Sequence, residues 1–299
     1  MPSNKIIPVK ILFKTFGFVT VLATVWTSIP TSSKAASPNQ GKYLFGVVPQ
    51  QSATRLAQIW VPFLNHLSKK AGVELQFATS KDIPTFEKCL AKGAYEFAFM
   101  NPYHYTVFSK KTGYRAFAHQ SKKMLKGVVV VRKDSTFKEL ADLSGKSLAF
   151  PSPAAFGASI LPRAEMTHLG IQFEPKYVKS HDSVYRSVAA GLYAAGGGVG
   201  RTFGRTPEKI RNQLQIIHNT KKYTPHAFAA ITSVPTDIVD RLRQAMAEVE
   251  TVSPDLVKSL GMQGIQLATD TAWDDVRSLG LREEETQIED AGDIKCRFD

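Results

Sequence analysis

The chain lacks the sequence patterns that mark most metal proteins, hydrolases and nucleic-acid-binding proteins. Its seven histidines are scattered, without an H-x-x-x-H pair or a His/Cys cluster, so no structural zinc site is expected. No G-x-S-x-G segment marks a serine nucleophile, and nothing singles out a Ser-His-Asp triad. No dense patch of Lys and Arg is interleaved with aromatic residues, which argues against nucleic acid as a partner. We therefore expect no cofactor, no metal and no enzymatic activity.

Glycine is concentrated in one segment, but not in a nucleotide-binding pattern. The segment reads Gly196-Gly197-Gly198-Val199-Gly200, and Phe203 stands where G-x-G-x-x-G requires its last glycine. The Gly-Lys-Ser/Thr of a P-loop is also missing. We expect either close approach of the backbone to its neighbours or a mobile segment here.

Cysteine is limited to Cys89 and Cys296. Cys89 lies with Phe86 and Leu90 in an expected helix, which is typical of a buried thiol, whereas Cys296 belongs to a polar tail. A disulfide between them is possible in an oxidising compartment, and the sequence leaves that choice open.

The first 36 residues have the layout of a signal peptide. Three lysines precede an apolar run over residues 16–26, and Ser33-Lys34-Ala35 supplies small residues for cleavage. The run is short for a membrane span, although a retained N-terminal anchor is the alternative. No cysteine follows it that would support a lipoprotein anchor, and no later segment is apolar for long enough to cross a bilayer. We expect a soluble protein exported to the periplasm. Loss of the four lysines before residue 37 lowers its net charge from +12 to +8, which favours anionic solutes and surfaces.

The remainder alternates strand and helix patterns, which predicts an α/β fold with largely parallel sheets. About 260 residues remain after the signal peptide, which is more than one ordinary core and suits two lobes. The tail after residue 281 is acidic and polar without an apolar period, so we expect it to be loose. Strands are expected at 43–48, 74–78, 97–100, 127–132, 147–150, 215–217 and 227–232, and an amphipathic helix at 235–249.

Four turns each end an expected strand and open a helix, and this pattern predicts an anion-binding cleft. Helix N-termini carry unpaired N–H groups and partial positive charge, so several of them facing one crevice would attract an anion. Asn101 is a good cap with Pro102 in the first turn, which indicates either a ligand-facing helix start or a plain one with aromatic packing. The helix that starts near residue 181 has Ser180 or Asp182 as its cap. His181 between them could instead donate a hydrogen bond to an anion, and this bond would be stronger with a protonated ring. The four segments are Gly46-Val47-Val48-Pro49, Asn101-Pro102-Tyr103-His104-Tyr105, residues 150–159 and Ser180-His181-Asp182-Ser183-Val184-Tyr185.

Together with two further segments, three of these motifs, those at residues 46–49, 101–105 and 180–185, resemble the phosphate/phosphite/phosphonate-binding group of ABC-transporter substrate-binding proteins. The resemblance covers residues 43–249 and implies a two-lobed type II periplasmic-binding (Venus flytrap) fold that closes on its ligand. Lobe one would hold residues 41–130 and 225–280, and lobe two would hold residues 131–224. Residues 281–299 would form the loose tail. The further segments are Phe97-Ala98-Phe99-Met100-Asn101-Pro102 and Leu140-Ala141-Asp142-Leu143-Ser144-Gly145-Lys146.

The resemblance also implies which residues bind ligand. Tyr105 and His181 match the aromatic and histidine ligands of the family, while Ala155 and Gly157 stand where the family has hydroxyls. An acidic ligand is replaced by Ala194 and a tyrosine by Ile83. A small oxyanion held by backbone N–H groups, or a more apolar ligand beside Phe156, would suit these differences. The expected ligand-binding residues are Asn101, Tyr103, Tyr105, Ala155, Phe156, Gly157, Ala158, His181 and Asp182.

Three functions remain open at this point. The first is a non-enzymatic periplasmic receptor that delivers a small, anionic solute such as phosphate, phosphite or a phosphonate to an ABC permease in the inner membrane. The second is the same trap acting as a ligand sensor for a membrane kinase. The third is an exported hydrolase, against which the lack of a paired nucleophile and base argues.

Overall fold

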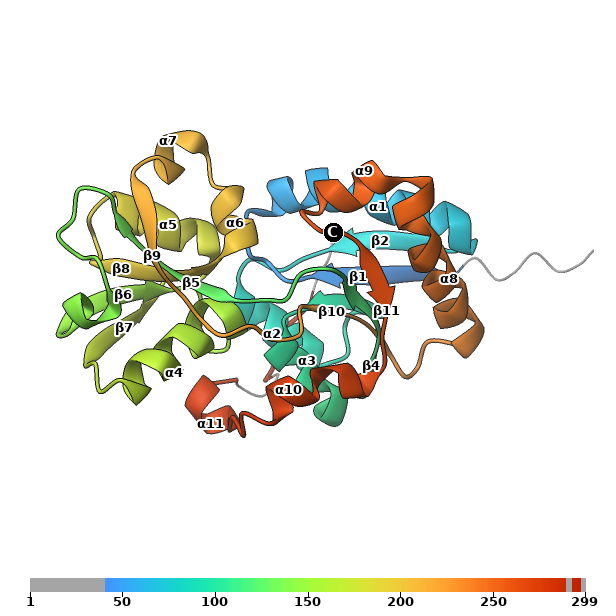
Figure 1. Ribbon diagram of the computed structural model, residues 1–299. Helices are drawn as coiled ribbons and strands as arrows, with labels where there is room; N and C mark the ends of the chain where they lie inside the picture. The colour runs from blue at the N-terminus through green and yellow to red at the C-terminus, as the bar shows by residue number, and fades with distance from the viewer. Residues whose placement is uncertain (1–40, 289–291, 297–299) are drawn as a thin grey trace, which may run out of the picture. The chain divides into compact units, whose positions relative to one another are not determined.

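The computed structural model describes residues 41–288 and 292–296, which belong to one compact unit, residues 38–299 (Figure 1). Two sheets and the helices around them make up this unit, so the predicted α/β class is confirmed. The predicted signal peptide, residues 1–36, lies outside the described residues. Within the described ranges, no helix combines the length and the apolar character needed to cross a membrane.

The first sheet has six strands in the order β11-β4-β10-β3-β1-β2. Strand β1 pairs in parallel with β2 and β3, whereas β10 runs antiparallel to β3 and β4, and β11 antiparallel to β4. The sheet is mixed, so the prediction of largely parallel sheets is wrong for its three antiparallel pairings. The strands are Lys42–Val47 (β1), Glu74–Ala78 (β2), Phe97–Met100 (β3), Tyr114–Gln120 (β4), Ala227–Ile231 (β10) and Ile265–Leu267 (β11).

Aromatic side chains fill the core of this sheet. Trp60 of the helix α1 lies 4.7 Å from Phe99 of β3, and Phe99 lies 4.9 Å from Phe228 of β10, between ring centroids. The apolar stripe of α1 brings these rings together because its buried residues recur at helical spacing. The helices packed with this sheet are α1 (Ala53–Ala71), α2 (Ile83–Ala91), α3 (Pro102–Lys111), α8 (Thr236–Val252), α9 (Pro254–Ser259) and α10 (Asp274–Arg277).

The second sheet has five strands in the order β7-β6-β8-β5-β9. It too is mixed: β6 pairs in parallel with β7 and β8, and β5 runs antiparallel to β8 and β9. Its strands are Gly127–Arg132 (β5), Lys146–Phe150 (β6), Phe173–Tyr177 (β7), Ala195–Val199 (β8) and Leu214–Asn219 (β9), and its helices are α4 (Leu161–His168), α5 (His181–Ala189), α6 (Gly200–Gly204) and α7 (Glu208–Arg211).

The glycine segment forms a fully buried strand, β8. A Cβ atom at Gly197 would lie 1.9 Å from the carbonyl oxygen of Ala158, and one at Gly198 would lie 2.1 Å from the Tyr185 hydroxyl. Any residue with a side chain would clash with these atoms at either position. Of the two alternatives for this segment, close approach of the backbone is therefore confirmed.

The two sheets are joined by two crossing segments, residues 121–126 and 220–226. Leu125 and Tyr223 exchange backbone hydrogen bonds of 2.8 Å in each direction, so the two crossings are paired. The predicted lobe boundary at residue 130 cuts through β5, which pairs with β8 and β9 of the second sheet. This strand belongs with residues 131–224, because its strand pairing is with β8 and β9 of that sheet.

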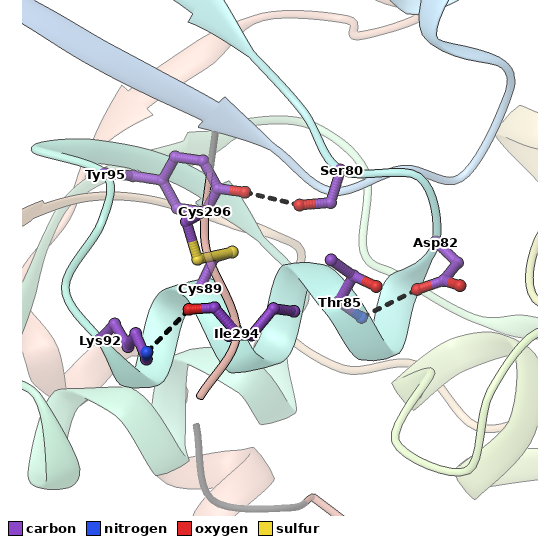
Figure 2. The surroundings of a disulfide bond; sticks show 8 residues. All are labelled: Ser80, Asp82, Thr85, Cys89, Lys92, Tyr95, Ile294 and Cys296. Carbon is purple, nitrogen blue, oxygen red and sulfur yellow. Dashed lines mark hydrogen bonds between the residues drawn. A yellow bond between two sulfur atoms is a disulfide. The ribbon is translucent and has the colours of Figure 1, made fainter. Parts of the chain in front are cut away.

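The C-terminal residues are held by a disulfide. Cys89 on α2 is bonded to Cys296 across 207 positions of sequence, and Lys92 donates to the carbonyl oxygen of Ile294 at 2.7 Å (Figure 2). A short helix, α11 (Glu283–Thr286), ends in the buried Thr286. The expectation of a loose tail is therefore wrong for these residues, because a covalent link outweighs the polar composition.

Candidate functional site

The helix α3 begins where β3 ends, and its cap reaches the second sheet. The Oδ1 atom of Asn101 accepts from the backbone N–H of His104 at 2.8 Å, which confirms the predicted cap. The Nδ2 atom of the same side chain donates to the carbonyl oxygen of Ala154 at 3.1 Å. Asn101 is buried, so one side chain both starts the helix and bonds the loop that follows β6.

The helix α5 begins in the same way on the other side. Ser180 is its cap and accepts from the N–H of Ser183 at 3.1 Å. His181 is the first helical residue, and its own N–H donates to the carbonyl oxygen of Gln50, just after β1, at 3.2 Å. The N-terminus of α5 therefore meets the turn that follows the first strand.

A small cavity lies where these elements meet. The volume open to the centre of a water molecule is about 10 Å³, which is room for about one water. Phe156 lines the cavity and is fully buried, with its ring 5.4 Å from that of Tyr223. The lining residues are Val48, Gln50, Ile83, Asn101, Ala155, Phe156, Gly157, Ala158, His181, Val199 and His226.

His181 is neutral in this setting. Burial, with a smaller contribution from the positive charge of Arg201, lowers the pKa of its imidazole to about 3. The stronger, protonated form of this donor is therefore not the one present, because an isolated charge is too costly where water is excluded. Its Nδ1 atom lies 3.0 Å from the Thr202 hydroxyl, and its Nε2 atom has no hydrogen-bond partner among the described residues. The Thr202 hydroxyl has a single hydrogen, which goes either to Nδ1 or to the carbonyl oxygen of Val199 at 3.1 Å. When it goes to Nδ1, the imidazole carries its proton on Nε2 and can donate one neutral hydrogen bond to a ligand; when it goes to Val199, Nδ1 donates to Thr202 and Nε2 is an acceptor.

His226 is held by a chain of hydrogen bonds through Gln50. Arg201 donates to Gln50 Oε1 at 2.8 Å, so the amide nitrogen of Gln50 faces His226 Nε2 at 3.1 Å and donates to it. The ring of His226 stacks on Phe99 at 5.0 Å. Burial, with the charge of Arg201, holds the pKa of His226 well below its usual value, so this histidine is also neutral.

The structure brings six of the nine predicted ligand-binding residues to the cavity and leaves three outside it. Tyr105 donates its hydroxyl to Asp270 at 2.6 Å and accepts from the N–H of Ala116 at 3.2 Å. The Tyr103 hydroxyl lies 2.9 Å from that of Thr286. Asp182 stands in the first turn of α5, where its charge suits the helix dipole. The six are Asn101, Ala155, Phe156, Gly157, Ala158 and His181.

Three polar residues that line the cavity or bond to its lining were not predicted from the sequence: Gln50, His226 and Arg201. Gln50 directly follows the Gly46-Val47-Val48-Pro49 turn, so extending that motif by one residue would have included it. His226 precedes β10 and Arg201 follows β8, and neither strand end was recognised as part of the cleft. Among residues 41–288 and 292–296, no group of three or more His, Cys, Asp or Glu side chains is placed to hold a metal ion.

Two sheets joined by paired crossings, with a cavity where helix N-termini meet, define a substrate-binding protein of the type II periplasmic class. A sequence profile described as "ABC transporter, phosphonate, periplasmic substrate-binding protein" matches residues 45–273, and the chain belongs to this family. The resemblance noted from the sequence is thereby confirmed.

Solved structures with a similar fold come from several bacteria. A binding protein component of an ABC phosphonate transporter from Pseudomonas aeruginosa has a TM-score of 0.75 and 15% identity, covering 83% of this chain and 88% of that one. PhnD1 from Prochlorococcus marinus in complex with methylphosphonate has a TM-score of 0.74 and 15% identity, covering 84% and 100%. The alkanesulfonate-binding protein SsuA from Xanthomonas axonopodis pv. citri bound to MOPS has a TM-score of 0.57 and 13% identity, covering 83% and 93%.

Proposed function

We propose that the protein is a non-enzymatic receptor that captures a small, anionic solute between its two sheets and delivers it to an ABC permease. Family membership supports the class of protein and the transport system. The finer assignment to an anion is supported by the charges around the cavity.

The observation that carries this proposal is that no acidic side chain of the described residues lines either of the two hollows between the sheets. The cavity beside His181 is lined by apolar, amide and neutral histidine groups. A neighbouring pocket adds three cations, Lys123, Lys126 and Arg201, and no described Asp or Glu lines either space. A cationic solute would have no partner there, whereas an anion would find both charge and hydrogen-bond donors.

Ligand entry requires the hydrogen bonds between the sheets to open. Three of them join the sheets around the cavity: His181 N–H to Gln50, Asn101 to Ala154, and Arg201 to Gln50. The cavity between them is too small for a phosphonate. We infer that the two crossing segments act as the hinge, because they are the covalent connections that such an opening would bend.

A thermal-shift screen tests the proposed ligand class. Purified protein is heated with phosphate, phosphite, methylphosphonate and methanesulfonate, and with choline as a cationic control. A solute that binds only the folded state raises the melting temperature. We expect at least one oxyanion to do so and choline to have no effect. A melting temperature that responds to choline and to none of the anions would refute an anionic ligand.

We also propose that the protein works in the periplasm after loss of residues 1–36. The basic, apolar and small-residue order of the N-terminus supports this. N-terminal sequencing of the exported protein should give a start near Ala36 or Ser37. An intact Met1 recovered with the membrane fraction would instead indicate a retained anchor.

A further inference from the structure

Arg201 is a partly buried cation without a counter-charge among the residues that the structure describes. It is the second residue of α6, directly after the glycine-rich strand β8, and its guanidinium lies 5.2 Å from the centroid of the Phe99 ring. Its Nη2 atom donates to Gln50, while Nε and Nη1 have no partner among the described residues. Burial and the nearby charge of Arg205 lower the pKa of Arg201 to about 9, yet it remains charged at neutral pH.

The pocket around Arg201 joins positive charge to an apolar wall. We define the Arg201 pocket by the residues Phe99, Gln120, Lys123, Met124, Leu125, Lys126, Val199, Gly200, Arg201, Pro225, His226 and Gly261. Its volume open to the centre of a water molecule is about 90 Å³, several times the room needed for one water. Val199 and His226 also line the cavity beside His181, so the two spaces are neighbours.

The cavity beside His181 is poorly suited to hold a charge by itself. Ala155 and Gly157 supply no hydroxyl, Phe156 fills space, and His181 is neutral. A hydrogen bond from a charged donor is roughly twice as strong as one from a neutral donor. The Nη2 atom of Arg201 has a second hydrogen beside a free N–H neighbour, so the planar, forked guanidinium still matches two oxygens of one anion.

We propose that Arg201, with Lys123 and Lys126 beside it, holds the charged group of the ligand. The ligand is then a tetrahedral oxyanion that carries one small apolar substituent, such as an alkylphosphonate. Two or three oxygens face the cations, and the fourth substituent faces the side chains of Met124, Leu125 and Val199. This inference rests on the proposed function and names the group that recognises the anion.

Calorimetric titration with methylphosphonate tests the assignment. Arg201→Gln should weaken binding at least about tenfold, the loss expected for a charged, two-pronged hydrogen bond. The matched control is Arg186→Gln, which removes the same charge from the exposed face of α5 and should leave the dissociation constant unchanged. Without ligand, Arg201→Gln should melt no lower than the wild type, because it removes an unpaired, partly buried charge.

Other outcomes separate this inference from the proposed function. Wild-type protein that binds no oxyanion would overturn the proposed function itself. Wild-type binding that Arg201→Gln leaves intact, while His181→Gln abolishes it, would overturn only the role of Arg201. Methylphosphonate should bind more tightly than inorganic phosphate, since phosphate would place a hydroxyl against the apolar wall. Tighter binding of phosphate would overturn the assignment of that wall.

Discussion

His181 donates its backbone N–H to the carbonyl oxygen of Gln50 at 3.2 Å, so the first residue of α5 is bonded to the turn that follows β1. The side chain of Gln50 makes two more contacts, accepting from Arg201 at 2.8 Å and donating to His226 at 3.1 Å. Gln50, in the turn after β1, is thereby bonded to His181, Arg201 and His226, the three groups that surround the proposed ligand site. A solute that enters between Gln50 and His181 must replace or rearrange these bonds.

Tyr105→Phe should lower stability without changing ligand affinity. The substitution removes the hydroxyl that donates to Asp270 and leaves the buried N–H of Ala116 without its acceptor. We expect a loss of about 1–3 kcal/mol in the free energy of unfolding. Urea denaturation and calorimetric titration of the same variant provide the two readouts. A much weaker dissociation constant with unchanged stability would instead place Tyr105 in the binding site.

Stability should fall in acid in part because of His181. Its folded-state pKa is about 3, below the ordinary value of 6.5, so the unfolded chain takes up a proton that the folded chain refuses. The stability that it contributes is complete above pH 6.5 and is lost as the pH falls toward 3. From pH 6.5 to 4.5 this amounts to about 2–3 kcal/mol.

Urea midpoints at pH 7 and pH 4.5 measure that loss. His181→Gln should lose about 2–3 kcal/mol less than the wild type between the two values. His168→Gln, at the exposed end of α4, is the control and should behave as the wild type. Equal acid losses in all three proteins would mean that His181 is not held neutral by burial.

Cys296→Ser should destabilise the protein by releasing its C-terminal residues from α2. The Cys89–Cys296 bond closes a loop of 207 positions, and its loss should cost about 2–4 kcal/mol. Wild-type protein melted with a reductant should match the variant, and the variant should not respond to the reductant. A reductant that leaves the wild-type melting temperature unchanged would contradict a stabilising role.

Sequence patterns predicted the α/β class well because most elements carry local signals. The apolar stripe of α1, the Asn101 cap and the β-branched run Gly127–Arg132 were each recognised. Strand β8 was missed because glycine disfavours strands. Glycine is required there because the Tyr185 hydroxyl and the Ala158 carbonyl oxygen approach the backbone closely, and the sequence of the segment alone does not show these contacts. The disulfide was likewise left open, since it depends on two positions that only the fold brings together.

Site residues that belong to a sequence motif were predicted, whereas those that reach the site only through the packing of distant segments were missed. Asn101 and His181 follow strand ends and lie at the cavity as expected. Tyr105 shares the Asn101 motif, but its helix turns its hydroxyl toward Asp270, 165 positions away in sequence. Arg201 belongs to no motif, because what marks it is a pocket in which the described residues supply no counter-charge.

A crystal structure of the protein grown with methylphosphonate tests the central claim most directly. Our account predicts density for the phosphonate between the two sheets, with its oxygens within hydrogen-bond distance of Arg201 and of Gln50 or His181. Phosphonate bound only to surface lysines, with the Gln50 bonds to His181 and Arg201 intact at saturating concentration, would contradict it.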